Sequence, residues 1–108
     1  MKFGLTDAAI ARIHGIFARH QQVERAILYG SRAKGNYKNG SDIDLTLVGG
    51  ADLNLQVMLQ IMNEIDDLLL PYSFDLSLYT MITDPEVIAH IQRVGVVFYE
   101  KAGEARPA

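Results

Sequence analysis

Cysteine and tryptophan are absent from the 108 residues, and proline occurs only 3 times. The absence of cysteine excludes disulfide bridges and thiolate metal sites, and it is compatible with a cytoplasmic protein. Neither sign of charge dominates, because the formal net charge is -3, so the surface as a whole does not favour nucleic acid. No apolar run approaches the roughly 20 residues of a transmembrane helix, and the N-terminus lacks the apolar core of a signal peptide. We therefore expect a cytoplasmic protein that binds neither membranes nor nucleic acid directly, with any anion site confined to a local patch.

A single domain is expected from the length of 108 residues, of which 49% are hydrophobic. A chain of this size can bury one core and little else. We expect one folded core over residues 1–101 and a flexible C-terminal tail over residues 102–108, because chain ends of this kind fray.

Three helices are predicted from apolar residues at helical spacing and from residues typical of helix ends. They cover residues 7–20, 53–70 and 85–94. Thr6 or Asp7 is expected to cap the first helix, and Asp52 is expected to cap the second, which Pro71 ends. Pro85, preceded by an aspartate and followed by a glutamate, is a favourable start for the third helix.

Four strands are predicted from short apolar runs bounded by glycine or polar residues. They cover residues 23–30, 42–48, 73–79 and 96–100. The order α-β-β-α-β-α-β predicts an α+β fold, in which a small mixed sheet packs against helices as an α/β sandwich. The polar segment 31–41 is expected to be a loop with one short helical turn after Ser31.

The second predicted helix has an unusually wide apolar face. Its apolar side chains spread over roughly 200° of arc, about twice what a surface helix needs. One explanation is that the helix lies wedged between the sheet and a neighbouring helix. The other is that its edge around Met58 and Met62 contacts another protein chain.

Asp42 and Asp44 begin the second predicted strand, in the stretch SDIDL. Side chains two apart on a strand share a face, so both carboxylates are expected to project together. Two like charges at that spacing repel unless a cation lies between them. Carboxylate oxygens suit Mg²⁺, which often takes one or two carboxylates and completes its shell with water and phosphate oxygens. Asp42 and Asp44 are therefore candidate metal ligands.

The preceding segment, GSRAKGNYKNG, has the composition of a phosphate-binding loop. Gly30 permits the backbone to approach a ligand closely, and successive N–H groups in a tight turn bind anions. Ser31 adds a hydroxyl donor, and Arg32 and Lys34 add positive charge near the expected position of a triphosphate. Each feature alone is common in loops, but phosphate binding beside paired carboxylates and Mg²⁺ is the apparatus of phosphoryl or nucleotidyl transfer.

Gly-Ser, ten further residues and Asp-x-Asp at the head of an apolar strand form one pattern, carried by Gly30, Ser31, Asp42 and Asp44. With its flanks ILYGSRAKGN and SDIDL, this pattern resembles the minimal nucleotidyltransferase (MNT) family of the DNA-polymerase-β-like nucleotidyltransferase superfamily. The resemblance covers nearly the whole chain, because the predicted order of elements is also that of the family. It implies that residues 1–101 are a nucleotidyltransferase catalytic core.

The resemblance also implies a third carboxylate on a later strand. Asp75 is the candidate, because it lies inside the otherwise apolar stretch YSFDLSLY, where an unpaired charge is costly. Asp66 and Asp67 are poorer candidates because they lie late in a helix, and Asp84 because it is better explained as a cap.

The mechanism implied by the resemblance uses ATP and two Mg²⁺ ions. Gly30 and Ser31 hold the terminal phosphates, while Asp42, Asp44 and Asp75 bind the metals. A hydroxyl that gives its proton to Asp75 attacks the α-phosphorus in line, and pyrophosphate leaves.

Stand-alone MNT proteins resemble the antitoxins of two-gene toxin–antitoxin pairs. The resemblance thus implies a HEPN-domain toxin, encoded by the adjacent gene, as partner, and transfer of AMP from ATP to a tyrosine of that toxin. Two alternatives stay open: a non-catalytic antitoxin that neutralises its partner by forming a complex, and a small-molecule transferase that needs a second subunit.

The three histidines carry no predicted site. His14, His20 and His90 share no spacing typical of metal ligands, and we expect them at the surface or at an edge.

Overall fold

The computed structural model describes residues 1–102, in which four strands form one mixed sheet in the order β3-β2-β1-β4. The strands are β1 (Val23–Tyr29), β2 (Ile43–Gly49), β3 (Phe74–Leu78) and β4 (Val96–Glu100). β1 runs antiparallel to both β2 and β4, whereas β2 and β3 are parallel. A parallel pair needs a crossover connection, and this one contains the helix α3 (Leu55–Asp66).

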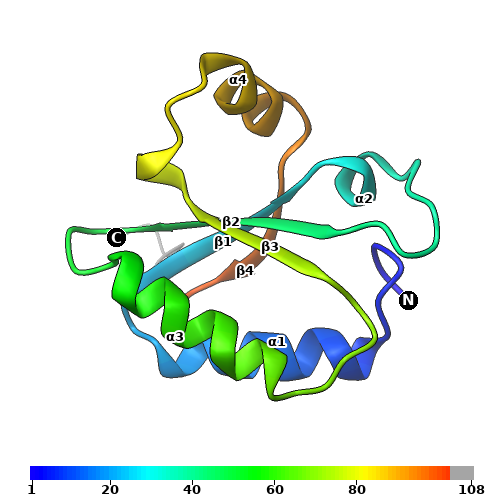
Figure 1. The fold of residues 1–108 in the computed structure, drawn as a ribbon, viewed down its shortest axis with the longest axis horizontal. Coiled ribbons are helices and arrows are strands. Elements are labelled where there is room, and N and C mark those ends of the chain that lie inside the picture. The colour runs from blue at the N-terminus through cyan, green and yellow to red at the C-terminus, as the bar shows by residue number, and fades with distance from the viewer. Residues whose placement is uncertain (103–108) are drawn as a thin grey trace.

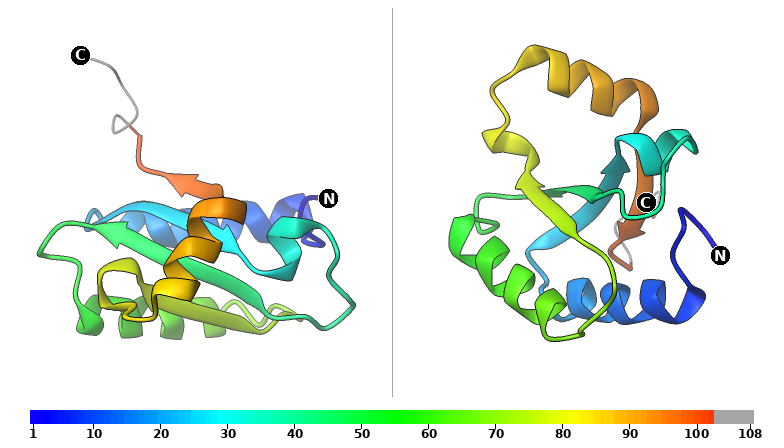
Figure 2. Two further views of the ribbon diagram at one scale, coloured as in Figure 1. Left: turned by 90° about the horizontal axis from the view of Figure 1, so that it is seen from above. Right: turned by 45° about the vertical axis from the view of Figure 1, so that its right-hand side comes forward.

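Helices lie on both faces of the sheet (Figure 1). α1 (Asp7–Arg19) and α3 lie side by side on one face, and α4 (Pro85–Val94) lies over the other, as the turned views confirm (Figure 2). A four-residue helix, α2 (Ser31–Lys34), follows β1, and a 3₁₀ turn, η1 (Tyr79–Met81), follows β3. The predicted α+β fold is confirmed. Apart from Ala102, the expected tail lies outside the described residues.

The hydrophobic core lies between the sheet and the pair α1 and α3. Ile43, Leu45 and Leu47 of β2 are buried in it. Because strand side chains alternate between faces, the intervening Asp44 lies on the opposite face of the sheet. No helix within residues 1–102 is long and apolar enough to cross a membrane.

Two predicted helix starts are confirmed by their caps. Thr6 Oγ1 accepts a hydrogen bond from the Ala9 N–H at 3.1 Å, so Thr6 caps α1. Asp84 Oδ1 accepts one from the Glu86 N–H at 2.9 Å, with Pro85 in the first turn of α4. The short helix expected after Ser31 is α2.

The predicted helix over residues 53–70 is too long at both ends. α3 begins after Asn54, whose side-chain oxygen accepts a hydrogen bond from the Val57 N–H at 3.0 Å, so Asn54 rather than Asp52 is the cap. The helix ends at Asp66, and Leu69 beyond it has a φ of 55°, a left-handed conformation that does not continue a helix.

Most of the wide apolar face of α3 is explained by packing within the chain. Its buried side chains are Val57, Ile61 and Ile65. Met58 and Met62 are partly buried against the same core, as expected for a helix wedged between a sheet and another helix. Leu55 and Leu59, one helical turn apart, remain 49% exposed each. The exposed apolar edge of α3 is therefore formed by leucines and not by the predicted methionines.

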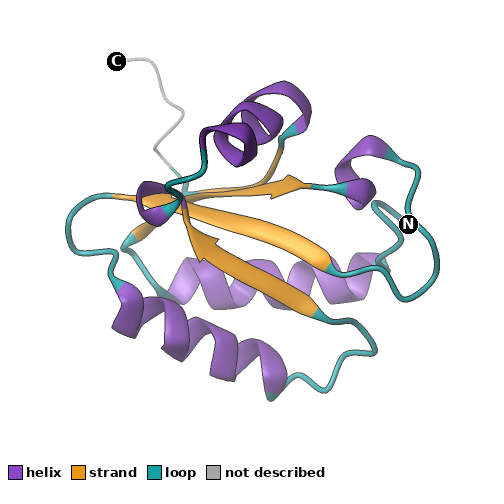
Figure 3. Cartoon of the chain, turned by 45° about the horizontal axis from the view of Figure 1, so that its top comes forward, coloured by secondary structure: helices purple, strands orange, loops and turns teal. Residues whose placement is uncertain are grey.

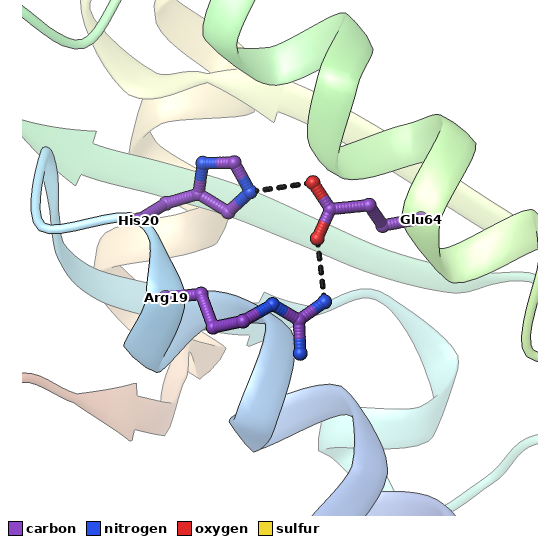
Figure 4. Close-up of polar contacts among 3 residues, drawn as sticks. All are labelled: Arg19, His20 and Glu64. Atoms are coloured by element: carbon purple, nitrogen blue, oxygen red, sulfur yellow. Dashed lines mark hydrogen bonds and ion pairs between the residues drawn. The ribbon is translucent and has the colours of Figure 1, made fainter.

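Glu64 joins α3 to the end of α1 (Figure 4). Its Oε1 accepts a hydrogen bond from Arg19 Nη2 at 2.6 Å, and its Oε2 lies 2.8 Å from His20 Nε2. Burial alone would raise the pKa of Glu64, but the hydrogen bonds from His20 and Arg19 outweigh it, and the pKa is lowered. The ionised carboxylate is therefore favoured by folding.

Replacing Glu64 with Gln is expected to lower the free energy of unfolding by about 0.5–1 kcal/mol near pH 6, the upper range for partly exposed ion pairs. Because the folded pKa lies below the unfolded one, this stabilisation is complete above the unfolded pKa and is lost as the pH falls through the folded pKa. Denaturant unfolding at about pH 6 and about pH 3 measures the difference. Glu100→Gln, which removes an exposed carboxylate of β4, is the control. If E64Q lowers the free energy of unfolding equally at both pH values, the expectation is contradicted.

Candidate active site

The parallel register of β2 and β3 places Asp44 opposite Asp75. On the other side of β2, Asp44 is opposite Tyr29 of β1. Asp42 lies one residue before β2, outside the strand in which it was predicted, and it is exposed. The structure thus brings Asp44 and Asp75 together as strand neighbours, with Asp42 close enough to act on the charge of Asp44.

Negative charge is concentrated around Asp44. Burial raises the pKa of Asp44. The charges of Asp75 and Asp42 raise this pKa further, whereas His90 of α4 lowers it. Negative charges gathered around one partly buried carboxylate form a place where a cation is favourable. Within residues 1–102, no three His, Asp or Glu side chains lie close enough together to form a ready metal cluster. The donors are the oxygens of two strand-neighbouring carboxylates, Asp44 and Asp75, and Asp42 does not join them in a preformed group of three. Two carboxylates fit Mg²⁺, because water and phosphate oxygens complete its shell.

Gly30 brings the predicted phosphate loop against Asp44. Its φ of 77° is a conformation that residues with a side chain rarely adopt. A Cβ at this position would overlap Asp44 Oδ2, so the loop backbone is in contact with the carboxylate. Ser31 follows as the first residue of α2, half-buried, and Lys34 is exposed at the end of the same helix. This contact is with a side chain of the same chain, and the approach of the Gly30 backbone to a ligand stays a prediction.

Arg32 has different contacts from those predicted. It is only 5% exposed, and its guanidinium donates hydrogen bonds to the carbonyl oxygens of Ser41 (3.0 and 2.8 Å) and Phe3 (2.7 Å). It also lies over the rings of Tyr37 and Tyr72. These contacts tie the N-terminal segment to the loop before β2 through three of the five N–H groups of the guanidinium. Binding of the nucleotide phosphates by Arg32 stays a prediction.

Two residues that sequence reasoning did not single out border Asp44. Burial raises the pKa of Tyr29, and Asp44 and Asp75 raise it as well. The ring of Tyr29 lies edge-on to that of His90, with centroids 6.3 Å apart. His90 is in the middle of α4, and only the position of α4 over the sheet brings it to this site, so no local pattern in the sequence could have identified it.

A mixed sheet with strand-neighbouring carboxylates beside a Gly-Ser turn defines a protein of the nucleotidyltransferase class. The chain belongs to the polymerase beta nucleotidyltransferase family, whose family model matches residues 11–104. A search of curated proteins gave no significant match.

Solved structures share the fold at low sequence identity. A toxin–antitoxin complex with AMP-PNP matches with a TM-score of 0.67 and 15% identity, over 91% of this chain and 76% of that one. A complex of the tri-AMPylated Shewanella oneidensis HEPN toxin with its MNT antitoxin matches with a TM-score of 0.64 and 12% identity, over 90% and 74% of the two chains. A minimal nucleotidyltransferase matches with a TM-score of 0.67 and 21% identity, over 89% and 95%. These matches confirm the predicted fold and the resemblance to MNT proteins.

Gly30→Ala is expected to disturb the site because a methyl group there meets Asp44 Oδ2. Gly35→Ala is the control for a positive φ, since Gly35 has a φ of 86° and a ψ of 2° with open space around its Cβ position. An alanine in this left-handed region costs about 1–2 kcal/mol. Gly30 has a ψ of -159°, in a region that is essentially confined to glycine, so G30A adds backbone strain to the overlap with Asp44. Denaturant unfolding should show a larger loss for G30A than for G35A, and the excess should shrink when Asp44 is also replaced by alanine. An excess that D44A leaves unchanged would mean that the contact with Asp44 has no energetic effect.

Asp44→Asn is expected to raise the free energy of unfolding of the metal-free protein near neutral pH. The folded pKa of Asp44 is raised, so the contribution of this group to stability falls as the pH rises from the unfolded pKa through the folded one. The gain from the substitution should therefore be larger near pH 7 than near pH 3, as measured by thermal unfolding in EDTA. Added Mg²⁺ should raise the Tm of the wild type more than that of D44N, and equal shifts would contradict a metal site at Asp44.

Proposed function

We propose that this protein is a Mg²⁺-dependent nucleotidyltransferase that transfers AMP from ATP to a tyrosine hydroxyl of a HEPN toxin and thereby acts as an antitoxin. The observation that carries the proposal is the pairing of Asp44 with Asp75 beside the Gly30–Ser31 turn. Membership of the nucleotidyltransferase family supports the class of reaction. Fold similarity to toxin–antitoxin complexes, one with AMP-PNP and one with a tri-AMPylated toxin, supports the nucleotide and the partner.

The Gly-Ser turn holds the phosphates in the proposed complex. Gly30 lets the backbone pass close to Asp44, and Ser31 donates its hydroxyl to the terminal phosphates of ATP. Lys34, exposed at the end of α2, adds positive charge to this loop–helix segment. Arg32 lines a separate cavity that Gly30, Asp44 and Asp75 do not line, so we do not assign it to this binding.

The carboxylates that would hold Mg²⁺ are Asp44 and Asp75, with Asp42 beside them. When bound, Mg²⁺ supplies positive charge that offsets the carboxylates and phosphates and lowers the pKa of the attacking hydroxyl. Asp75, exposed on β3, accepts the proton of that hydroxyl as its oxygen bonds to the α-phosphorus. The bond from the α-phosphorus to the bridging oxygen breaks, and pyrophosphate leaves.

A protein acceptor fits the exposure of this site. Asp42 and Asp75 are both exposed, and Asp44 is half-buried between them and β1. Small-molecule sites are usually concave and cover most of their ligand. An open site at the sheet surface instead admits a tyrosine carried by another folded protein.

Asp44→Asn and Asp75→Asn are each expected to reduce AMP transfer by about two orders of magnitude or more, because each removes a charge that acts on the reacting phosphate. Asp52→Asn is the control, since Asp52 is an exposed carboxylate outside the site. The assay incubates the protein with α-labelled ATP, Mg²⁺ and the product of the adjacent gene, and follows label on the partner. Circular dichroism of each variant shows that the fold is intact.

The outcomes separate the proposed enzyme from the alternatives. Label on a partner tyrosine that disappears in EDTA and in D44N supports the transferase. A stable complex without label supports the non-catalytic antitoxin. Full transfer by D44N would overturn the assignment of the site.

A further inference from the structure

A cavity of about 320 Å³ lies between the N-terminal segment, the loop before β2 and the segment before β3. In Figure 3 the N-terminus lies beside the loop that follows α2. The residues that line the cavity include Gly4, Arg32, Tyr37, Ser41, Tyr72 and Ser73. This volume is about ten times that of one water molecule and lies at the lower end of the range for small-molecule sites.

Arg32 brings a buried positive charge to this cavity. Of the five N–H groups of a guanidinium, three donate to the carbonyls of Ser41 and Phe3, and two have no acceptor within residues 1–102. No carboxylate of the described residues forms an ion pair with Arg32. A buried charge without a counter-ion is costly, so the position favours an anion.

The walls of the cavity are built around this guanidinium. Its carbon lies 5.0 Å from the centre of the Tyr37 ring and 5.8 Å from that of Tyr72. Gly4 closes one side so tightly that a Cβ there would lie 2.5 Å from Arg32 Nη1 and 2.8 Å from the Tyr37 ring. The aromatic rings offset part of the charge through cation–π contact and leave apolar faces beside it.

The other polar groups of the cavity include hydrogen-bond donors. Ser41 Oγ accepts a hydrogen bond from the Lys38 N–H at 3.0 Å, which leaves its own O–H free to donate. Asn39 and Ser73 contribute an amide and a second hydroxyl. Among the described residues that line the cavity, Arg32 is the one charged side chain, so no acidic group opposes an anion there.

We propose that this cavity binds a small molecule bearing an oxyanion, a carboxylate or a phosphate, which pairs with Arg32 and the Ser41 hydroxyl while its body lies against Tyr37 and Tyr72. The cavity is distinct from the proposed nucleotide site, because Asp44, Asp75 and Gly30 do not line it. The inference does not rest on the proposed transfer reaction. Because Ser41 directly precedes Asp42, an occupant would also hold the loop that leads into the proposed active site.

The test is a titration of the ¹⁵N-labelled full chain, free of metal and nucleotide, with inorganic phosphate and separately with acetate, at constant ionic strength set by NaCl. We expect saturable shifts of the Gly4, Gly40 and Ser41 amides and of the Arg32 Nε–H signal. A stronger response to phosphate identifies a phosphate group as the ligand, and a stronger response to acetate identifies a carboxylate. Shifts that do not saturate, that chloride reproduces, or that are confined to Ser31 and Lys34 would overturn the proposal.

Ser41→Ala is the variant of choice, because it removes the hydroxyl and keeps the carbonyl that holds Arg32. We expect binding about tenfold weaker, the usual effect of losing one hydrogen bond to a charged group. Thr83→Ala, which removes an exposed hydroxyl elsewhere, should bind like the wild type. Arg32→Gln should abolish the shifts, with Arg12→Gln as the control of equal charge. If S41A and R32Q, each tested alone, both bind the anion with the affinity of the wild type, the site is refuted.

Discussion

The register of β2 against β3 is the constraint on which the site depends. In a parallel pair, the residue opposite Asp44 is fixed by hydrogen bonding along the whole ladder, from Ile43–Phe74 to Leu47–Leu78. A shift of one residue would turn every side chain of β3 to the other face, which would expose Leu76 and Leu78 and bury Asp75. The hydrophobic core therefore maintains the position of the two carboxylates, although it contains neither of them.

At Asp44, the arrangement that suits the proposed function lowers the stability of the fold. Asp44 is partly removed from water beside Asp75 and Asp42, all of like charge. Buried residues on the other face of β2, such as Leu45 at 0% exposure, supply the apolar packing that offsets this repulsion. The contact between Gly30 and Asp44 limits how far the carboxylate can move to relieve it. Preorganised charge of this kind is a common basis of catalysis.

Local chemistry explains how much of the fold could be predicted from the sequence. Asp84 and Pro85 define the start of α4 by capping and by a fixed φ, and the predicted range 85–94 is the observed one. Asn54, and not the predicted Asp52, caps α3. Both residue types cap helices, and only the path of the chain after β2 selects between them.

Gly30, Ser31 and Asp44 could be proposed as site residues because they follow one another along the chain in one pattern. A third carboxylate was expected only from the resemblance to the MNT family, and Asp75 was the candidate because its charge interrupts an apolar strand. The contacts of Arg32 could not be predicted, because its hydrogen-bond partners come from the N-terminal segment and from the far end of the loop. His90 could not be predicted either, since its place near Asp44 depends on how α4 crosses the sheet.

The crossover through α3 has a consequence for biosynthesis. β1 and β2 are neighbours in sequence and can pair as soon as residue 49 is free, but β3 joins β2 only after a further helix has been made. The last strand, β4, must then pair with β1 on the opposite edge. A nascent chain that ends before β3 therefore lacks Asp75, so the complete set of carboxylates can form only after the crossover helix has been made.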